Sequence, residues 1–397
     1  MLIGIVGKPS SGKTTFLNAL CKTDAKTADY PFTTIQPNTG IGFAYHPCVC
    51  IEVNVTCQPR NSECIDKVRK IPIKIIDVAG LVPGAHEGRG LGNQFLSDLS
   101  EADVLLHIVD CSGSLNEEGE NVDPGSHDPL KDVQFLEDEI VYWMFGIIGK
   151  KWDRMVKRAL SDRVDLSVLL AEQFSGLKIT RSHILQALKK TEGDPTKWKE
   201  ADLLPFIREL RAVAKPILVI ANKIDRPTST ENFKKLQDYL GAENVVPASA
   251  LIESILKNYH EKGAVQYNSY TGELDITDPS LLSSKEQEIV QRIKNEILSR
   301  YGTSGIISTI NKAVFEILNM ISVYPVADTT HFADGDGTVL PDVFLVPKGT
   351  TCKELAGKVH REIAEKFIHG IDAKTNRRIA DNYELKDKDI IKIVHAG

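Results

Sequence analysis

The amino-terminal 20 residues constrain the fold more than any other part of this chain. The apolar run Leu2–Val6 is followed by G-K-P-S-S-G-K-T at residues 7–14, and residues 15–20 have a helical pattern. A strand, a glycine-containing loop and a helix in this order are the context that a phosphate-binding loop requires. The glycines allow backbone N–H groups to point at phosphate oxygens, and the helix adds its positive amino-terminal end. We therefore expect this segment to bind a nucleoside triphosphate.

The side chains of this loop have separate expected roles. Lys13 should reach the β- and γ-phosphates, and the Thr14 hydroxyl should ligate Mg²⁺. The alternative, a chance match in a glycine and serine loop, is disfavoured because the strand and the helix are both in place. The residues expected to contact the nucleotide here are Lys8, Pro9, Ser10, Ser11, Gly12, Lys13, Thr14 and Thr15.

Two later segments are predicted to complete the γ-phosphate and Mg²⁺ site. The stretch 30–40 contains two prolines and few apolar residues, which indicates a loop, and either Thr33 or Thr34 could add a second hydroxyl to Mg²⁺. The apolar run 71–76 ends in D-V-A-G, which begins at Asp77. A carboxylate at the end of a strand is suited to bind a water molecule that coordinates Mg²⁺. Gly80, three residues later, is then expected to lie beside the γ-phosphate.

The motif for the base follows further along the chain. The apolar run 216–221 is followed by Asn222-Lys223-Ile224-Asp225. The Asp225 carboxylate can accept two N–H bonds from guanine, which adenine does not offer, so we expect GTP rather than ATP. The Lys223 stem should cover the base while its amine contacts the phosphate loop. A further strand at 244–246 ends before Ser249-Ala250, where a backbone N–H near Ala250 could hold guanine O6.

Residue 81 bears on the rate of hydrolysis. Many regulatory GTPases place a glutamine just after the D-x-x-G glycine to orient the attacking water. The residue here is Leu81, which cannot form a hydrogen bond to water. Hydrolysis must therefore recruit another group or be intrinsically slow.

With these motifs in place, the chain resembles the Obg-like P-loop GTPases, in the YchF-related, archaeal and eukaryotic-type branch that ends in a TGS domain. The resemblance rests on Y-P-F-T-T-I-Q-P-N-x-G at 30–40, D-V-A-G-L-V-P-G-A at 77–85 and G-x-G-L-G-N-Q-F-L at 88–96. It implies that Thr34 is the switch threonine and that a hydrophobic residue in place of the glutamine is usual. It also implies a TGS domain associated with RNA and the ribosome, and a helical insertion with a partner-binding surface.

The resemblance leaves the catalytic group open. YchF itself is specialised for ATP through an altered base motif, whereas that motif is intact here. Some relatives use an asparagine at the position of Ser10 to bind an activating K⁺, so potassium stimulation is not expected. A histidine before the helical insertion has a catalytic role in the branch, and His127 lies in that region. His86, in a glycine-rich segment, is a second weak candidate, and for both residues an ordinary surface histidine is the favoured alternative.

Four of the seven cysteines fall within 17 residues, between the switch loop and Asp77. They are Cys48, Cys50, Cys57 and Cys64. Four thiolates could close a tetrahedral zinc site on an extended hairpin, in which Ile51–Thr56 alternates like a strand. The alternative is a set of buried hairpin cysteines, because the spacing lacks the paired C-x₂-C knuckles of common zinc modules.

Composition and pattern define the expected organisation. The 397 residues carry a net charge of −6, have 42% hydrophobic residues and contain no apolar run of the ~20 residues that a membrane span requires. Seven cysteines without a secretion signal favour a reducing cytoplasm. We expect neither a membrane nor DNA as a partner. We expect an α/β fold with a doubly wound, mostly parallel sheet, a helical insertion and a carboxyl-terminal β-grasp domain. Apolar spacing predicts helices at about 284–300 and 305–320, and Thr351-x-x-Glu354 predicts a capping box that opens a helix to about Phe367. The expected domains are 1–125 (with a cysteine-rich hairpin excursion at 46–70), the insertion 126–205, the second GTPase part 206–321 and the TGS domain 322–397.

These observations lead to one main hypothesis and its alternatives. The main hypothesis is a monomeric, cytoplasmic GTPase that uses GTP, GDP and Mg²⁺ and that acts on the ribosome or ribosomal RNA, and for the four cysteines Zn²⁺ binding and simple burial stay open. The turn at Lys374, Arg377 and Arg378 could contact phosphates, although a solvated basic turn explains it equally well. One alternative is a nucleotide-sensing module with negligible hydrolysis, and another is an ATPase like YchF. A small-molecule kinase would need a dedicated acceptor site.

Overall fold

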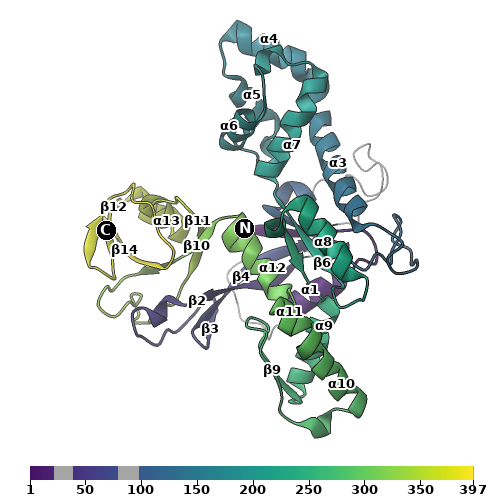
Figure 1. Ribbon diagram of the computed structural model, residues 1–397. Coiled ribbons are helices and arrows are strands. Elements are labelled where there is room, and N and C mark those ends of the chain that lie inside the picture. The colour runs from purple at the N-terminus through teal and green to yellow at the C-terminus, as the bar shows by residue number, and fades with distance from the viewer. Residues whose placement is uncertain (22–38, 79–97, 397) are drawn as a thin grey trace. The chain divides into compact units, whose positions relative to one another are not determined.

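A computed structural model describes residues 1–21, 39–78 and 98–396 (Figure 1). These residues divide into two compact units, each of which is considered by itself. The first unit contains Met1–Thr23, Gln36–Gly40 and Lys74–Thr309, as far as they are described, and the second contains Ile41–Ile73 and Ile310–Gly397. The segments at 22–38 and 79–97 lie outside the described residues.

A mostly parallel sheet forms the centre of the nucleotide-binding part. Its strand order is β2-β4-β1-β5-β6-β7, and β3 pairs with β4. Strand β1 lies parallel to β4 and β5, β5 to β6, and β6 to β7. Because these strands are parallel, their carboxyl ends lie along one edge. The strands are β1 Leu2–Val6, β2 Thr39–Pro47, β3 Glu63–Ile65, β4 Val68–Asp77, β5 Val104–Asp110, β6 Ile217–Asn222 and β7 Val245–Pro247.

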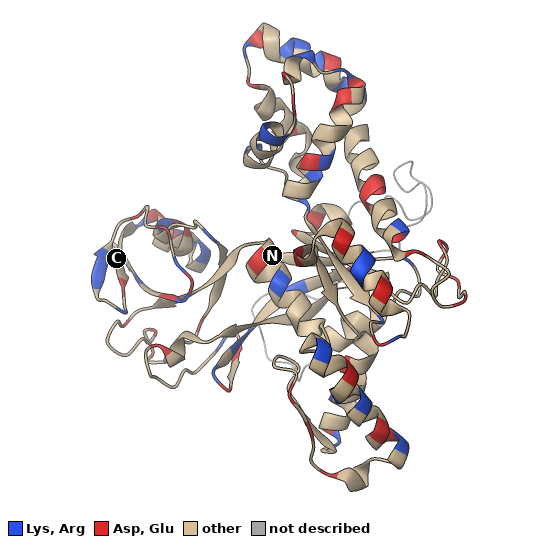
Figure 2. Cartoon of the chain, in the orientation of Figure 1, with Lys and Arg blue, Asp and Glu red and all other residues tan. Residues whose placement is uncertain are grey.

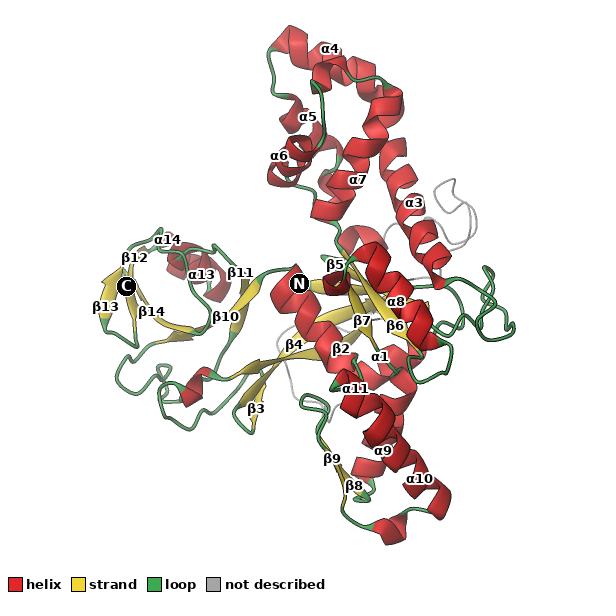
Figure 3. Ribbon diagram, in the orientation of Figure 1, coloured by secondary structure: helices red, strands yellow, loops and turns green. Residues whose placement is uncertain are grey.

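Helices pack around this sheet, as Figure 3 shows by colour. Helix α1, Lys13–Cys21, follows the phosphate loop and buries Phe16, Ala19 and Leu20. Helix α8 (Ser229–Leu240) leads to β7, and α9 (Ala250–Glu261) begins directly after it. The alternation of buried apolar strands with amphipathic helices confirms the predicted α/β class.

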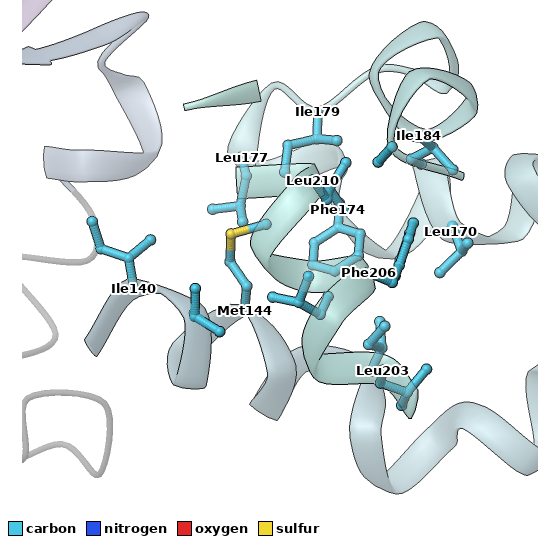
Figure 4. Packing of buried hydrophobic residues seen from close by; sticks show 14 of the residues in the cluster. Ile140, Met144, Leu170, Phe174, Leu177, Ile179, Ile184, Leu203, Phe206 and Leu210 are labelled. Atoms are coloured by element: carbon cyan, nitrogen blue, oxygen red, sulfur yellow. The ribbon is translucent and has the colours of Figure 1, made fainter. Parts of the chain in front are cut away.

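The insertion between β5 and β6 is helical, as expected. Its helices are α3 Pro129–Ile148, α4 Trp152–Asp162, α5 Leu166–Gln173, α6 Arg181–Lys190 and α7 Leu203–Ala214. Side chains from α3, α5 and α7 converge on one apolar cluster (Figure 4). Met144, Phe174, Phe206 and Leu210 are completely buried there. The helical spacing of apolar residues therefore reports internal packing of the insertion rather than a ligand pocket.

The remainder of the first unit is a helical extension with a small hairpin. The hairpin strands are β8 Val265–Tyr267 and β9 Leu274–Ile276, and the helices are α10 Ser284–Arg292, α11 Ser299–Tyr301 and α12 Ile306–Asn311. Helix α12 crosses the boundary after Thr309. The π-helical stretch Ile293–Leu298 follows α10 in the first unit, and the π-helical stretch Lys312–Ile317 follows α12 in the second, where periodicity had predicted continuous helices. Both charge signs occur on α10 (Figure 2), which is typical of a solvent-facing surface.

The second unit contains a five-stranded sheet of β-grasp type. Its order is β11-β10-β14-β12-β13, with β10 and β14 parallel and the other pairs antiparallel. Its elements are β10 Met320–Val326, β11 Phe344–Pro347, α13 Cys352–Val359, α14 Arg361–Glu365, β12 Phe367–Asp372, β13 Arg377–Ile379 and β14 Asp389–His395. Thr351 and Glu354 form the predicted capping box. The predicted β-grasp arrangement is confirmed.

Two local predictions in this unit were wrong. The stretch Ile51–Thr56 is not a strand, because a 3₁₀ turn at Val49–Ile51 and irregular chain replace it. Alternation over six residues is too short to force pairing where no partner strand is available. The single helix expected from residue 352 to about Phe367 is broken at His360, whose extended backbone separates α13 from α14.

Among the described residues, no helix combines the length and the apolar character needed to cross a lipid bilayer.

Candidate nucleotide-binding site

The phosphate loop lies between β1 and α1, as its sequence predicted. Gly7 and Gly12 have φ angles of 151° and 100°, a region that side chains rarely adopt. A Cβ on Gly12 would lie 2.3 Å from the amide nitrogen of Asn222, so this position must be glycine for that close approach. The Lys13 amine folds back over the loop and donates to Gly7 O at 2.6 Å and to Lys8 O at 2.9 Å. These bonds hold the loop in a curled shape.

Asp77 lies at the end of β4, opposite Ile5 of β1, and faces the same region. Burial lowers the pKa of Lys13, and the charge of Asp77 partly opposes that shift. Burial likewise raises the pKa of Asp77, and Lys13 partly opposes it. Oδ1 of Asp77 is buried without a hydrogen-bond partner among the described residues. A buried, unsatisfied carboxylate oxygen beside the phosphate loop fits the expected ligand of a Mg²⁺-bound water.

Asn222 connects the phosphate loop to the segment expected to bind the base. It is the last residue of β6, and only 3% of its surface is exposed. Its side-chain amide donates to Ser11 O at 2.9 Å, and its Oδ1 accepts from Ala250 N at 3.2 Å. One buried side chain therefore holds two loops that are 239 residues apart, from position 11 to position 250.

This geometry changes the expected role of Ala250. Its N–H donates to Asn222, so in this structure it supports the motif rather than standing free for guanine O6. Ser249 caps α9 by accepting from Ile252 N, and its own N–H donates to Ser304 O. Both residues thus fix the position of the helix start next to Asn222.

Lys223 departs from its expected contact. Its amine forms an ion pair with Asp110 Oδ2 at 3.1 Å instead of contacting the phosphate loop. Asp110 ends β5 in register with Asn222 and accepts further bonds from Ser112 and Ser114. Burial alone would raise the pKa of Asp110, but these hydrogen bonds and Lys223 lower it below its usual value. Asp225 is accessible, with one fifth of its side chain exposed, beside Arg226.

Asp110 is a site residue that sequence reasoning missed. The available signal was its position, because a carboxylate directly after a buried strand of a parallel sheet lies at the edge where ligands bind. Asp77 was identified by the same signal together with its glycine, and Asp110 lacks such a motif.

A second missed network holds the other end of the phosphate loop. Lys8 forms a buried ion pair with Asp132 of α3 at 2.8 Å and donates to Leu115 O at 3.0 Å. Asp132 also bonds His127 Nε2 at 2.9 Å, and His127 is 9% exposed. His127 is therefore not a surface histidine, and its ring nitrogen is engaged with the carboxylate that holds Lys8. The first helix of the insertion is thereby bonded to the phosphate loop.

Several predicted site residues lie outside the described residues. They are Thr33, Thr34, Gly80, Leu81 and His86. Their expected roles stay predictions.

The four cysteines of the second unit converge. Their sulfur atoms all lie within 4.8 Å of one another, and Cys48 Sγ lies 3.9 Å from Cys57 Sγ. All four are free thiols. The hydrogen bond with Cys57 lowers the pKa of Cys48 to about 5, while burial raises the pKa of Cys50 to about 12. Only Cys64 lies on a strand, so the cysteines come together through irregular chain and not through the expected hairpin.

The basic turn of the carboxyl-terminal sheet is only partly free. Lys374 forms an ion pair with Glu52 at 2.6 Å, which commits its amine within the second unit. Arg377 and Arg378 are exposed on β13. Of the three basic residues that could contact phosphates, only the two arginines are therefore still candidates.

Comparison with known proteins follows the same division of the chain. Residues 2–137 match the family model described as 50S ribosome-binding GTPase, residues 220–328 match the G4 motif-containing domain of the Obg-like GTPase YGR210-like family, and residues 334–395 match the TGS domain.

Individual relatives cover the whole chain. A GTP-binding protein of Methanocaldococcus jannaschii is 46% identical, over 100% of this chain and 99% of that protein. The ribosome-binding ATPase YchF of Buchnera aphidicola is 27% identical, over 99% of this chain and 94% of that protein. The crystal structure of a GTP-binding protein from Pyrococcus horikoshii covers 100% of both chains at 36% identity, with a TM-score of 0.78. The chain therefore belongs to the Obg-like, YchF-related family of P-loop GTP-binding proteins with a carboxyl-terminal TGS domain.

Proposed function

We propose that this protein binds GTP with Mg²⁺, hydrolyses it to GDP and phosphate, and acts in the cytoplasm as a nucleotide-dependent switch on the ribosome or its RNA. The observation that carries the proposal is the Asn222 side chain, bonded at 2.9 Å to Ser11 O and at 3.2 Å to Ala250 N. It ties a phosphate-binding loop to a base-recognition motif. A ligand that matches both must have phosphates at one end and a base at the other.

The residues of the phosphate loop would hold the triphosphate. The Lys13 amine has two carbonyl partners now, and phosphate oxygens would offer it stronger, charge-assisted bonds. Thr14, Thr34 and Asp77 would hold Mg²⁺, which neutralises phosphate charge when bound. The Oδ1 atom of Asp77, which has no hydrogen-bond partner in the described part of the chain, supports this assignment.

The intact Asn222-Lys223-Ile224-Asp225 motif supports guanine as the base. ATP is the alternative nucleotide, because some relatives, such as the Buchnera YchF, are named ATPases. The Asp225 carboxylate distinguishes the two, because it can accept from guanine N1 and N2 and finds no such donor pair on adenine. The ion pair of Lys223 with Asp110 positions the backbone from which Asp225 projects.

Hydrolysis should be slow without an activator. Leu81 cannot form a hydrogen bond to the attacking water. The Nε2 atom of His127 is bonded to Asp132, so this nitrogen is not available to a water molecule. A switch that is read through nucleotide occupancy alone, with negligible hydrolysis, is therefore the second candidate function. The printed name of the Buchnera relative supports the ribosome as partner, and exposed Arg377 and Arg378 on β13 offer phosphate contacts.

The test combines nucleotide binding, turnover and ribosome association. We expect GTP and GDP to compete with a fluorescent guanine nucleotide at far lower concentrations than ATP does. We expect multiple-turnover GTP hydrolysis that ribosomes accelerate and that Lys13→Ala abolishes. Co-sedimentation with ribosomes should differ between the GTP-analogue and GDP states. Preference for ATP would refute the base assignment, absent turnover with and without ribosomes would favour the occupancy switch, and no sedimentation in any state would refute the ribosome proposal.

A further inference from the structure

The four cysteines lie on a segment that has little structure of its own. Between Cys48 and Cys64 the chain contains one 3₁₀ turn, and the only strand is β3, which begins at Glu63. The main-chain bonds that shape it locally include those from Val55 N to Cys50 O at 3.2 Å and from Cys48 N to Lys67 O at 2.8 Å. Such a short excursion cannot bury enough apolar surface to be stable alone.

The sulfur geometry matches a tetrahedral metal site. Zn–S bonds of about 2.3 Å place the sulfurs of a ZnS₄ tetrahedron about 3.8 Å apart. Cys48 and Cys57 are already 3.9 Å apart, and every other pair is within 4.8 Å. A disulfide would require about 2.05 Å, and all four are free thiols. Cysteines that merely filled a core would have no reason to direct all four sulfurs to one point, especially since Cys57 and Cys64 are partly exposed.

We propose that Cys48, Cys50, Cys57 and Cys64 bind one structural Zn²⁺, and that this ion fastens the segment 48–64 to the TGS domain. Four protein ligands leave no open position, so the site is closed and structural rather than catalytic. The proposal is independent of the nucleotide site.

The loop between Cys57 and Cys64 makes the contacts through which the proposed ion would fasten this segment to the TGS domain. Gln58 N donates to Val339 O at 2.8 Å, and Arg60 N donates to Pro341 O at 2.8 Å. The Asn61 side chain bonds both main-chain groups of Val343, at 2.9 and 3.0 Å. Metal–sulfur bonds at Cys57 and Cys64 would close this loop at both ends, so the chain between the two ligands would lose conformational freedom. The loop would then already be ordered in the conformation that contacts residues 339–343.

Other contacts run from the same segment to the same domain. Glu52, between the second and third cysteines, pairs with Lys374 at 2.6 Å and with Lys388 at 3.2 Å. Arg69, on the strand after the last cysteine, is fully buried and donates to Leu340 O at 2.9 Å. Cys48 and Cys50 belong to the same buried cluster as Tyr324 of β10. The proposed ion therefore sits among the residues that join the excursion to the β-grasp sheet.

The first test is metal content. Full-length protein carrying no histidine tag and purified without chelator should contain one zinc per chain by mass spectrometry. Cys57→Ser and Cys64→Ser should each lose it, whereas Cys352→Ser, which removes a buried thiol from α13 of the same unit, should keep it. Retained guanine-nucleotide binding checks that the variants are folded. Zinc-free wild type should also take up Co²⁺ with the visible absorption of a tetrahedral tetrathiolate site.

The second test is hydrogen exchange with and without zinc. Stripping wild-type protein with a strong chelator should accelerate exchange at the amides of Gln58, Arg60 and Val343 by about tenfold or more, and zinc should restore it. Amides of the buried strand β5 should not change. Absence of zinc with no Co²⁺ uptake, iron in its place, a disulfide between any two of the four, or zinc loss in Cys352→Ser would overturn the site. If zinc is present but its removal leaves the exchange rates of these amides unchanged, the proposal that the ion fastens segment 48–64 to the TGS domain is refuted.

Discussion

Asn222→Ala is the substitution that tests the central feature of the nucleotide site. The side chain is almost wholly buried and makes two bonds, to Ser11 O at 2.9 Å and from Ala250 N at 3.2 Å. Its removal leaves one carbonyl and one N–H buried without partners. Each such orphan costs about 1–3 kcal/mol, so we expect the free energy of unfolding to fall by about 2–4 kcal/mol, less than the full sum because water can enter the vacated space.

The same substitution should weaken nucleotide binding. The bonds fix the phosphate loop relative to the base motif, so the variant must reorder both when it binds. Each 1.4 kcal/mol of reordering costs tenfold in affinity. We expect the Kd of GDP to rise by at least about tenfold and that of GTP to rise similarly. Titration of a fluorescent guanine nucleotide measures the affinities, and thermal unfolding measures the stability.

Asn232→Ala is the matched control. Asn232 lies on α8, is 6% exposed and donates one bond to Cys111 O at 3.0 Å, outside every nucleotide motif. It should lose about 1–2 kcal/mol of stability with no change in Kd. The reasoning is refuted if Asn222→Ala binds GDP within about threefold of wild type, or if Asn232→Ala weakens binding to the same extent.

Three further predictions concern charge. Burial, assisted by Lys13 and Lys8, lowers the pKa of His107 to about 3, whereas an unfolded histidine titrates near 6.5. Between these values the unfolded state binds the extra proton, so stability should fall by about 2 kcal/mol from pH 7 to pH 5, and thermal unfolding of His107→Leu should lack this dependence. Asp225→Ala should weaken GTP at least about tenfold and leave ATP unchanged in competition binding, because it removes two charge-assisted bonds; an equal loss for both nucleotides would contradict the base assignment. Lys8→Ala should lower the free energy of unfolding by about 3 kcal/mol in chemical denaturation, because the buried Asp132 carboxylate loses its Lys8 cation and keeps its hydrogen bond with His127. Asp132→Asn should cost less, because the asparagine side-chain oxygen can still accept a hydrogen bond from the Lys8 amine; equal losses would contradict this account.

The residues that sequence reasoning placed correctly share a physical property. The strand Leu2–Val6, the loop at 7–14 and the start of α1 are contiguous, so their geometry follows from local backbone preferences and burial. The capping box at Thr351 and Glu354 is local in the same sense. Where local preference was weak, as at Ile51–Thr56, a 3₁₀ turn and irregular chain formed instead of the expected strand.

The sequence by itself determined a parallel α/β sheet, a phosphate-binding loop and a guanine-type base motif, because each is encoded in a short run of residues. Only the tertiary structure decided that Lys223 pairs with Asp110, that Asp132 holds Lys8, and that Asn222 bridges two loops. The pairs Lys223–Asp110, Lys8–Asp132 and Asn222–Ser11 are each more than 100 positions apart in the chain, and nothing in their local sequence identifies one residue to the other. The four thiols are near in sequence, yet their convergence depends on the β-grasp sheet against which their irregular segment packs.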